Sequence, residues 1–176
     1  RLAGLPRGPL LSWRPPPRRA WALLPFVVAG SLSLATLLWH LGLALVPANE
    51  TLALYAEAMA GFDSTWGLVV VSVLPGLGEE LLYRGAILGL LRKGWPTWAA
   101  LVGQAALFAL AHGLAVRLPY TFGLGLLFGL LTLRTGSLWP AIVAHAAHNL
   151  LAASLGEHLP GPEQPWPWLF AALGLA

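Results

Sequence analysis

The chain lacks cysteine and has few charged residues. None of its 176 residues is cysteine, which excludes a disulfide framework, a thiolate nucleophile and a cysteine-ligated metal. Charged residues make up 10% of the chain, against about 25% in an ordinary soluble domain. Such a chain has too few charges to cover a soluble surface, so the composition argues against a soluble enzyme, a disordered chain and a nucleic-acid-binding protein. Hydrophobic residues make up 57%, and the nine tryptophans suit the interfacial belts of a membrane protein.

Long apolar runs separated by short polar connectors predict membrane-spanning helices. A span needs roughly 20 mostly apolar residues. In chain order the runs cover residues 20–46, 66–91, 96–114, 119–133, 138–155 and, only partly, 166–176. We therefore expect an all-α fold, a polytopic transmembrane helix bundle of about five to six spans with a buried polar site.

The chain divides into a short arm and one membrane domain. Residues 1–19 form a basic arm whose Pro15-Pro16-Pro17 triplet excludes a helix. Residues 20–176 form the transmembrane domain, with a catalytic core expected at 66–155. A short interfacial helix is expected at 52–60, and Pro75-Gly76 is expected to break or tilt the second span.

The distribution of charge predicts the orientation in the membrane. If the arm is cytoplasmic and the spans alternate, eight basic residues lie inside and one lies outside. The inner eight are Arg1, Arg7, Arg14, Arg18, Arg19, Arg92, Lys93 and Arg134, while Arg117 is the exception. The acidic residues Glu50, Glu57, Asp63, Glu157 and Glu163 all fall outside. We therefore expect a multi-pass protein of the cell membrane with a cytoplasmic N-terminus.

Ionisable side chains within the predicted spans are the most informative feature of the sequence. Such residues are costly to expose to lipid, and they usually face the bundle interior and mark function. Here they are Glu79, Glu80, Arg84, His112, His145 and His148, with Asn149 beside the last. Three pairs have i,i+4 spacing and so share a helix face: Glu80 with Arg84, Phe108 with His112, and His145 with Asn149. Three helices thus each present a polar stripe that can converge in a bundle core.

In chain order the three stripes read EExxxR, FxxxH and HxxxN, from Glu79 to Asn149. This set resembles the CPBP family of intramembrane proteases, which includes the type II CAAX prenyl endopeptidases and the bacterial Abi proteins. The resemblance implies an intramembrane endopeptidase. Its substrate would be a peptide or protein segment presented at the membrane, and the lipid bilayer would be its other partner.

The resemblance also implies roles for individual residues. Glu79 matches the catalytic glutamate that activates water, and His112 matches its partner in holding that water. His145 and Asn149 match the pair that stabilises the oxyanion. The supporting residues are Glu80, Arg84 and Phe108, whereas His148 is outside the motif and is expected to have no catalytic role.

The cofactor is left open between two alternatives. Glu79, His112 and His145 have the side-chain types that hold zinc with one open position, which would make the protein a metalloprotease. The same glutamate and histidines can also activate water without a metal. The sequence contains no HExxH, so the zincin pattern is absent.

Two functions other than proteolysis are also expected to fit parts of the pattern. One is a bacteriocin-immunity or scaffold membrane protein without turnover, and the other is a proton-coupled transporter, since buried Glu and His chains also serve pumps. Gly125 and Gly129 have GxxxG spacing, which predicts close helix packing first and a homodimer as the alternative. The richness in Ala, Leu, Gly and Arg, with a single Lys, favours a bacterial source.

Overall fold

The computed structural model describes residues 13–46, 53–54, 57 and 64–155. Its main elements are all helical: α1 (Arg18–Leu45), α3 (Thr65–Glu79), the π-helix η2 (Glu80–Ile87), α4 (Leu88–Gly94), α5 (Thr97–Ala111), the 3₁₀-helix η3 (Ala115–Arg117), α6 (Leu118–Thr135) and α7 (Trp139–Leu155). The predicted all-α fold is therefore confirmed. The predicted segments 166–176 and most of 52–60 lie outside the described residues.

Three helical stretches are long and apolar enough to cross a membrane: Arg18–Leu45, Thr65–Gly94 and Ala115–Thr135. The third predicted span, 96–114, is shorter than expected, because α5 stops at Ala111. It stops there because Gly113 has a φ of 72°, a left-handed conformation that the α-helix does not continue through. Together with α5 and α7, the three long stretches account for the five runs predicted between residues 20 and 155.

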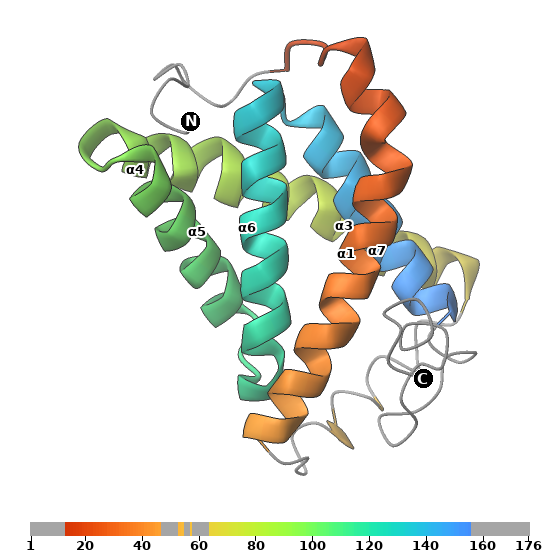
Figure 1. Ribbon diagram of the computed structural model, residues 1–176. Coiled ribbons are helices and arrows are strands. Elements are labelled where there is room, and N and C mark those ends of the chain that lie inside the picture. The colour runs from red at the N-terminus through yellow and green to blue at the C-terminus, as the bar shows by residue number, and fades with distance from the viewer. Residues whose placement is uncertain (1–12, 47–52, 55–56, 58–63, 156–176) are drawn as a thin grey trace, which may run out of the picture.

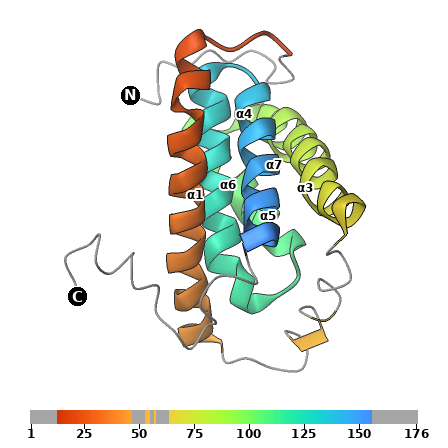
Figure 2. The ribbon, with the colours of Figure 1, turned by 90° about the vertical axis from the view of Figure 1, so that its right-hand side faces the viewer.

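Helix α6 lies at the centre of the bundle. It packs against α1 on one side and α5 on the other, and α7 packs mainly against α3 and α1. Figure 1 shows α3, η2 and α4 as one continuous rod that runs across the other helices. In the turned view, α1, α6 and α7 run side by side (Figure 2). The crossing brings the middle of this rod against α5, α6 and α7.

The helix ends follow local sequence signals. Ser64 caps α3 by accepting a hydrogen bond from the Gly67 amide at 3.1 Å. Gly136 ends α6 in a left-handed conformation with φ of 65°. Helix α1 begins at Arg18, directly after the proline triplet and two residues before the predicted start at residue 20. The described part of the arm is anchored to the start of α7, because the Trp13 carbonyl accepts from Trp139 Nε1 at 3.3 Å.

The expected break at Pro75-Gly76 is wrong. Helix α3 continues through Pro75 to Glu79, and the departure from α-helical geometry comes later, in η2. Pro75 removes one N–H from the helix ladder, but a proline can stay in a membrane helix when a neighbouring helix supplies the missing donor. The polar motif itself is therefore the irregular part of the rod.

Candidate active site

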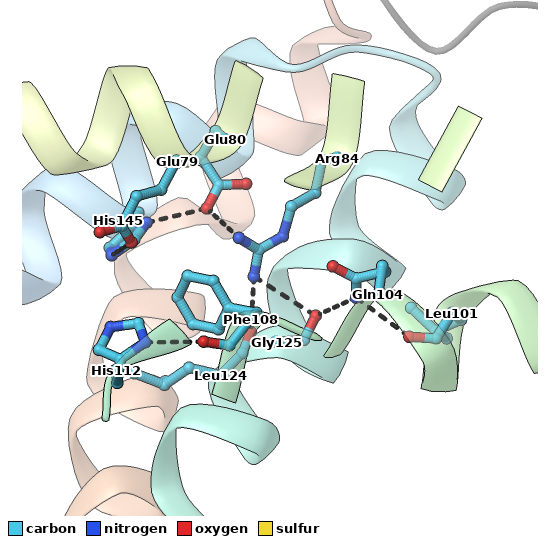
Figure 3. Close-up of polar contacts among 10 residues, drawn as sticks. All are labelled: Glu79, Glu80, Arg84, Leu101, Gln104, Phe108, His112, Leu124, Gly125 and His145. Atoms are coloured by element: carbon cyan, nitrogen blue, oxygen red, sulfur yellow. Dashed lines mark hydrogen bonds and ion pairs between the residues drawn. The ribbon is translucent and has the colours of Figure 1, made fainter. Parts of the chain in front are cut away.

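Four elements bring the polar stripes together. Glu79 ends α3, Glu80 and Arg84 lie on η2, Phe108 lies on α5 and His145 on α7. His112 follows the last residue of α5. Figure 3 shows these side chains gathered around the Phe108 ring. The structure thus places six of the seven predicted site residues in one neighbourhood.

Glu80 and Arg84 form a sealed ion pair. Their side chains are fully buried, and Arg84 Nη1 lies 2.8 Å from Glu80 Oε1. Arg84 Nη2 also lies 3.4 Å from the carbonyl oxygens of Leu124 and Gly125 on α6. A buried charge is tolerated when it is paired and further hydrogen-bonded. This pair therefore fixes η2 against α6 and does not face a substrate.

The π-helix places this pair where four elements meet. At its end the Leu88 amide donates to the carbonyl of Tyr83, five residues earlier, as a π-helix requires. The wider turn changes which way each side chain points compared with an α-helix. Short π-helical segments of this kind occur frequently at functional sites.

His145 connects the sealed pair to Glu79. Its Nδ1 lies 2.8 Å from Glu80 Oε1, and its Nε2 lies 3.8 Å from Glu79 Oε2. A carboxylate only accepts hydrogen bonds, so Nδ1 carries the hydrogen and the other nitrogen is directed to Glu79. The Glu79 side chain is 33% exposed, whereas that of Glu80 is 0% exposed. Of the two side chains only that of Glu79 is partly accessible, and its Oε2, which faces His145, is buried.

His112 presents one free nitrogen in the same neighbourhood. Its Nδ1 lies 2.7 Å from the Phe108 carbonyl oxygen. Because a carbonyl only accepts, Nδ1–H is the donor and the lone pair of the neutral ring lies on Nε2. No hydrogen bond or ion pair joins His112 to Glu79 within the described part of the chain.

Phe108 is the aromatic centre of the cluster. Its ring is 1% exposed and makes edge contacts with His112 and His145, at centroid distances of 4.7 and 6.0 Å. The Arg84 guanidinium lies 4.4 Å from the same centroid, a cation–π distance. The ring of Phe128 on α6 stacks on His145 at 5.1 Å. These contacts hold both imidazoles in fixed orientations.

Asn149 is the predicted site residue that the structure places apart from the cluster. Its Nδ2 donates to the carbonyl of Val71 on α3 at 3.5 Å. His148, which is outside the motif, points to α1 instead. Ser31 donates its hydroxyl hydrogen to Val28, so His148 Nδ1–H donates to Ser31 Oγ, at 2.9 Å.

Gln104 belongs to the site, and sequence reasoning missed it. It is fully buried on α5, and its Nε2 donates to the Gly125 carbonyl at 2.8 Å. Arg84 Nη2 lies 3.4 Å from that same oxygen, so both side chains donate to one carbonyl of α6 (Figure 3). One signal was available, because Gln104, Phe108 and His112 recur at i, i+4 and i+8 on one face.

The glycines of α6 serve packing within the chain. A Cβ added to Gly125 would lie 2.9 Å from Ala105 Cα, and one added to Gly129 would lie 2.6 Å from a Leu101 methyl carbon. Close approach of α5 and α6 therefore requires the glycine face. The homodimer stays a prediction.

The donor set does not fit a metal ion as it is arranged. Among the described residues, no three His, Asp or Glu side chains lie close enough together to hold one. The zinc alternative stays a prediction, and no chemical step below depends on it.

An apolar groove of about 410 Å³ lies between α3 and α7. Its walls include Ser72 and Val73 on α3 and Ala146 on α7, the residue directly after His145. The groove is lined by apolar side chains and Ser72, and none of the cluster residues is among them.

Fold and site together define a class: an all-helical membrane protein with a carboxylate–histidine cluster enclosed between its helices. The family described as type II CAAX prenyl endopeptidase Rce1-like matches residues 61–151, which is more than half of the chain. The chain belongs to this family of CAAX proteases, as the motifs predicted. No curated protein and no solved structure gives a significant match. The matched region contains every predicted site residue, from Glu79 to Asn149.

Proposed function

We propose that the protein is an intramembrane endopeptidase in which Glu79 activates water to hydrolyse a peptide bond. Its substrates are peptides or protein segments presented at the membrane. The enzyme itself is a multi-pass protein whose N-terminus is cytoplasmic. One observation supports this proposal above the others. Glu79, partly exposed, faces His145 Nε2 at 3.8 Å, while His145 Nδ1 is held at 2.8 Å by the sealed Glu80.

The proposed reaction begins with a water beside Glu79 and His112. Glu79 takes a proton from this water while the water oxygen attacks the carbonyl carbon of the substrate. His112 Nε2, the unprotonated nitrogen of the neutral ring, accepts a hydrogen bond from the water and orients it. Glu79 then gives the proton to the departing nitrogen as the carbon–nitrogen bond breaks, so that no proton is left over.

His145 stabilises the negative charge that develops on the carbonyl oxygen. When its ring carries a hydrogen on both nitrogens, Nδ1–H is held by Glu80 and Nε2–H is available to the oxyanion. A donor fixed in this way contributes more than a mobile one, because it need not reorganise during the reaction. The role of the Glu80–Arg84 pair is to hold the imidazole, and it does not contact the substrate.

The test compares Glu79→Gln with the parent, both reconstituted in lipid vesicles. The probe is an internally quenched prenylated CAAX peptide, with the unprenylated peptide beside it. Loss of the base is expected to lower kcat by about 10²- to 10⁴-fold. Glu57→Gln is the matched control, because Glu57 is an exposed residue in the connector, and it is expected to cleave like the parent. Full cleavage by Glu79→Gln would reject Glu79 as the base, and absence of cleavage by the parent would favour a scaffold role.

Zinc is tested in the same preparations by elemental analysis and by cleavage after chelation. A metal-independent reaction predicts unchanged cleavage after chelation, and a zinc content below roughly one ion per ten chains. Stoichiometric zinc with loss of activity on its removal would assign the metalloprotease alternative instead.

A further inference from the structure

A third polar ring, that of Tyr83 on η2, packs on Phe108 beside the two imidazoles. The Tyr83 and Phe108 ring centroids lie 5.1 Å apart, with an interplanar angle of 82°. His112 and His145 make the same kind of edge contact with Phe108, at angles of 66° and 77°. One phenylalanine therefore orients a phenol as well as two imidazoles, and the proposed reaction so far uses only the imidazoles.

The Tyr83 ring is buried, but its hydroxyl has no partner inside the described part of the protein. The residue is 9% exposed. Its hydroxyl makes no hydrogen bond to another described residue, although a buried tyrosine usually finds a partner for this group. The oxygen is also not among the partnerless polar atoms that are sealed from solvent, which include Ser72 Oγ and Gln104 Oε1. A hydroxyl that is neither bonded nor sealed is open to an incoming molecule.

Tyr83 lies close to the proposed general base. Glu79 lies four residues earlier, about one helical turn, and its charge interacts electrostatically with the Tyr83 phenol. No hydrogen bond joins the two side chains, so the hydroxyl is not used to hold the carboxylate. A phenol can donate one hydrogen bond. A substrate carbonyl that reaches the water beside Glu79 therefore also comes near an unused donor.

From this arrangement we propose that Tyr83 is a catalytic residue whose hydroxyl donates a hydrogen bond to the carbonyl oxygen of the scissile peptide bond. Negative charge develops on that oxygen as water attacks, and a preorganised donor stabilises it. Tyr83 thus acts beside His145. No bond to Tyr83 forms or breaks and the phenol keeps its proton, so the proton balance of the reaction is unchanged. The proposal rests on the proposed function, because its ligand is the carbonyl group of that substrate.

The first test is Tyr83→Phe, which removes the hydroxyl and keeps the ring on Phe108. We expect kcat on the prenylated CAAX peptide to fall by about 10²- to 10³-fold, the usual effect of removing one oxyanion donor, with KM little changed. Thermal unfolding in mixed micelles should stay as in the parent. Tyr120→Phe is the matched control, since the Tyr120 hydroxyl already accepts from Arg117 Nε, and it is expected to cleave like the parent. Parental kcat in Tyr83→Phe would overturn the proposal.

The second test measures binding, with two uncleavable forms of the same peptide. One carries a phosphinate at the scissile bond, whose tetrahedral anionic oxygens resemble the transition state, and the other carries a CH₂–NH link without a carbonyl oxygen. Tyr83→Phe should weaken phosphinate binding by about tenfold or more and leave the CH₂–NH peptide unaffected. Equal effects on both peptides would assign Tyr83 to packing and overturn the proposal. A parent that neither cleaves the peptide nor binds the phosphinate would refute the proposed function itself, whereas an active parent matched by Tyr83→Phe refutes only the role of Tyr83.

Discussion

Glu79 and Glu80 are neighbours in the sequence but lie in opposite surroundings. Glu80 is fully buried and shares one oxygen between Arg84 and His145, each at 2.8 Å. Glu79 is one-third exposed, and its side chain lies 3.8 Å from His145 Nε2. The comparison separates the site into a sealed half that holds the helices and an accessible half to which the proposed function assigns the chemistry.

The largest expected effect comes from breaking the sealed half. Arg84→Leu leaves Glu80 buried without its main partner, and removing one member of a buried pair costs about 3–5 kcal/mol. We expect the free energy of unfolding in mixed micelles to fall by that amount, and cleavage to fall with it. The double variant Glu80→Leu with Arg84→Leu should be less destabilised than Arg84→Leu alone. If the single variant is as stable as the parent, the pair is not structural.

Glu79→Gln provides the contrast in the accessible half. Glu79 has no direct hydrogen bond to another described side chain, and its side chain is one-third exposed. We therefore expect the free energy of unfolding to change by less than about 1 kcal/mol, within the usual range for a side chain away from the packed core. The same variant should lose cleavage. Glu79→Gln therefore lowers activity without lowering stability, whereas Arg84→Leu lowers both.

The glycines before the motif sharpen the comparison by testing how closely the two helices approach. Gly76 and Gly78 lie two residues apart on α3, but only Gly76 faces α7. A methyl group on Gly76 would lie 2.9 Å from the Ala146 backbone, whereas one on Gly78 meets nothing within 4 Å. Gly76→Ala should therefore lower stability by about 1–3 kcal/mol, as overpacking does. Gly78→Ala should be neutral or raise stability, because alanine favours the helix by up to about 1 kcal/mol.

The sequence predicts those parts of the site that depend on spacing along one helix. The i,i+4 spacing places Glu80 opposite Arg84 and His112 beside Phe108, and both contacts are present. Contacts between helices depend on crossing angles and register, which no local pattern contains. The link from His145 to Glu80 and the diversion of Asn149 to Val71 are of this kind.

The irregular rod shows a further limit of local reasoning. Pro75 is a strong local signal for a break, yet the helix continues through it, and the Val71 carbonyl accepts from Asn149 on α7, 74 residues after Pro75. The π-helix at Glu80–Ile87 has no equivalent local signal in the amino-acid sequence. A sequence reading can place the polar residues in the membrane, but it cannot say which of two adjacent carboxylates is sealed.

The smallest predicted effect extends the sealed half to Gln104. The Gly125 carbonyl accepts from Gln104 Nε2 at 2.8 Å and from Arg84 Nη2 at 3.4 Å. Gln104→Leu removes the first of these two donors. Hydrogen bonds between membrane helices contribute about 0.6 kcal/mol on average and up to about 1.7 kcal/mol. We expect a loss of stability in that range in mixed micelles, with kcat reduced less than in Arg84→Leu. Glu80 and His145 keep their contact in this variant, so a loss of cleavage as large as that of Glu79→Gln would show that Gln104 belongs to the accessible half.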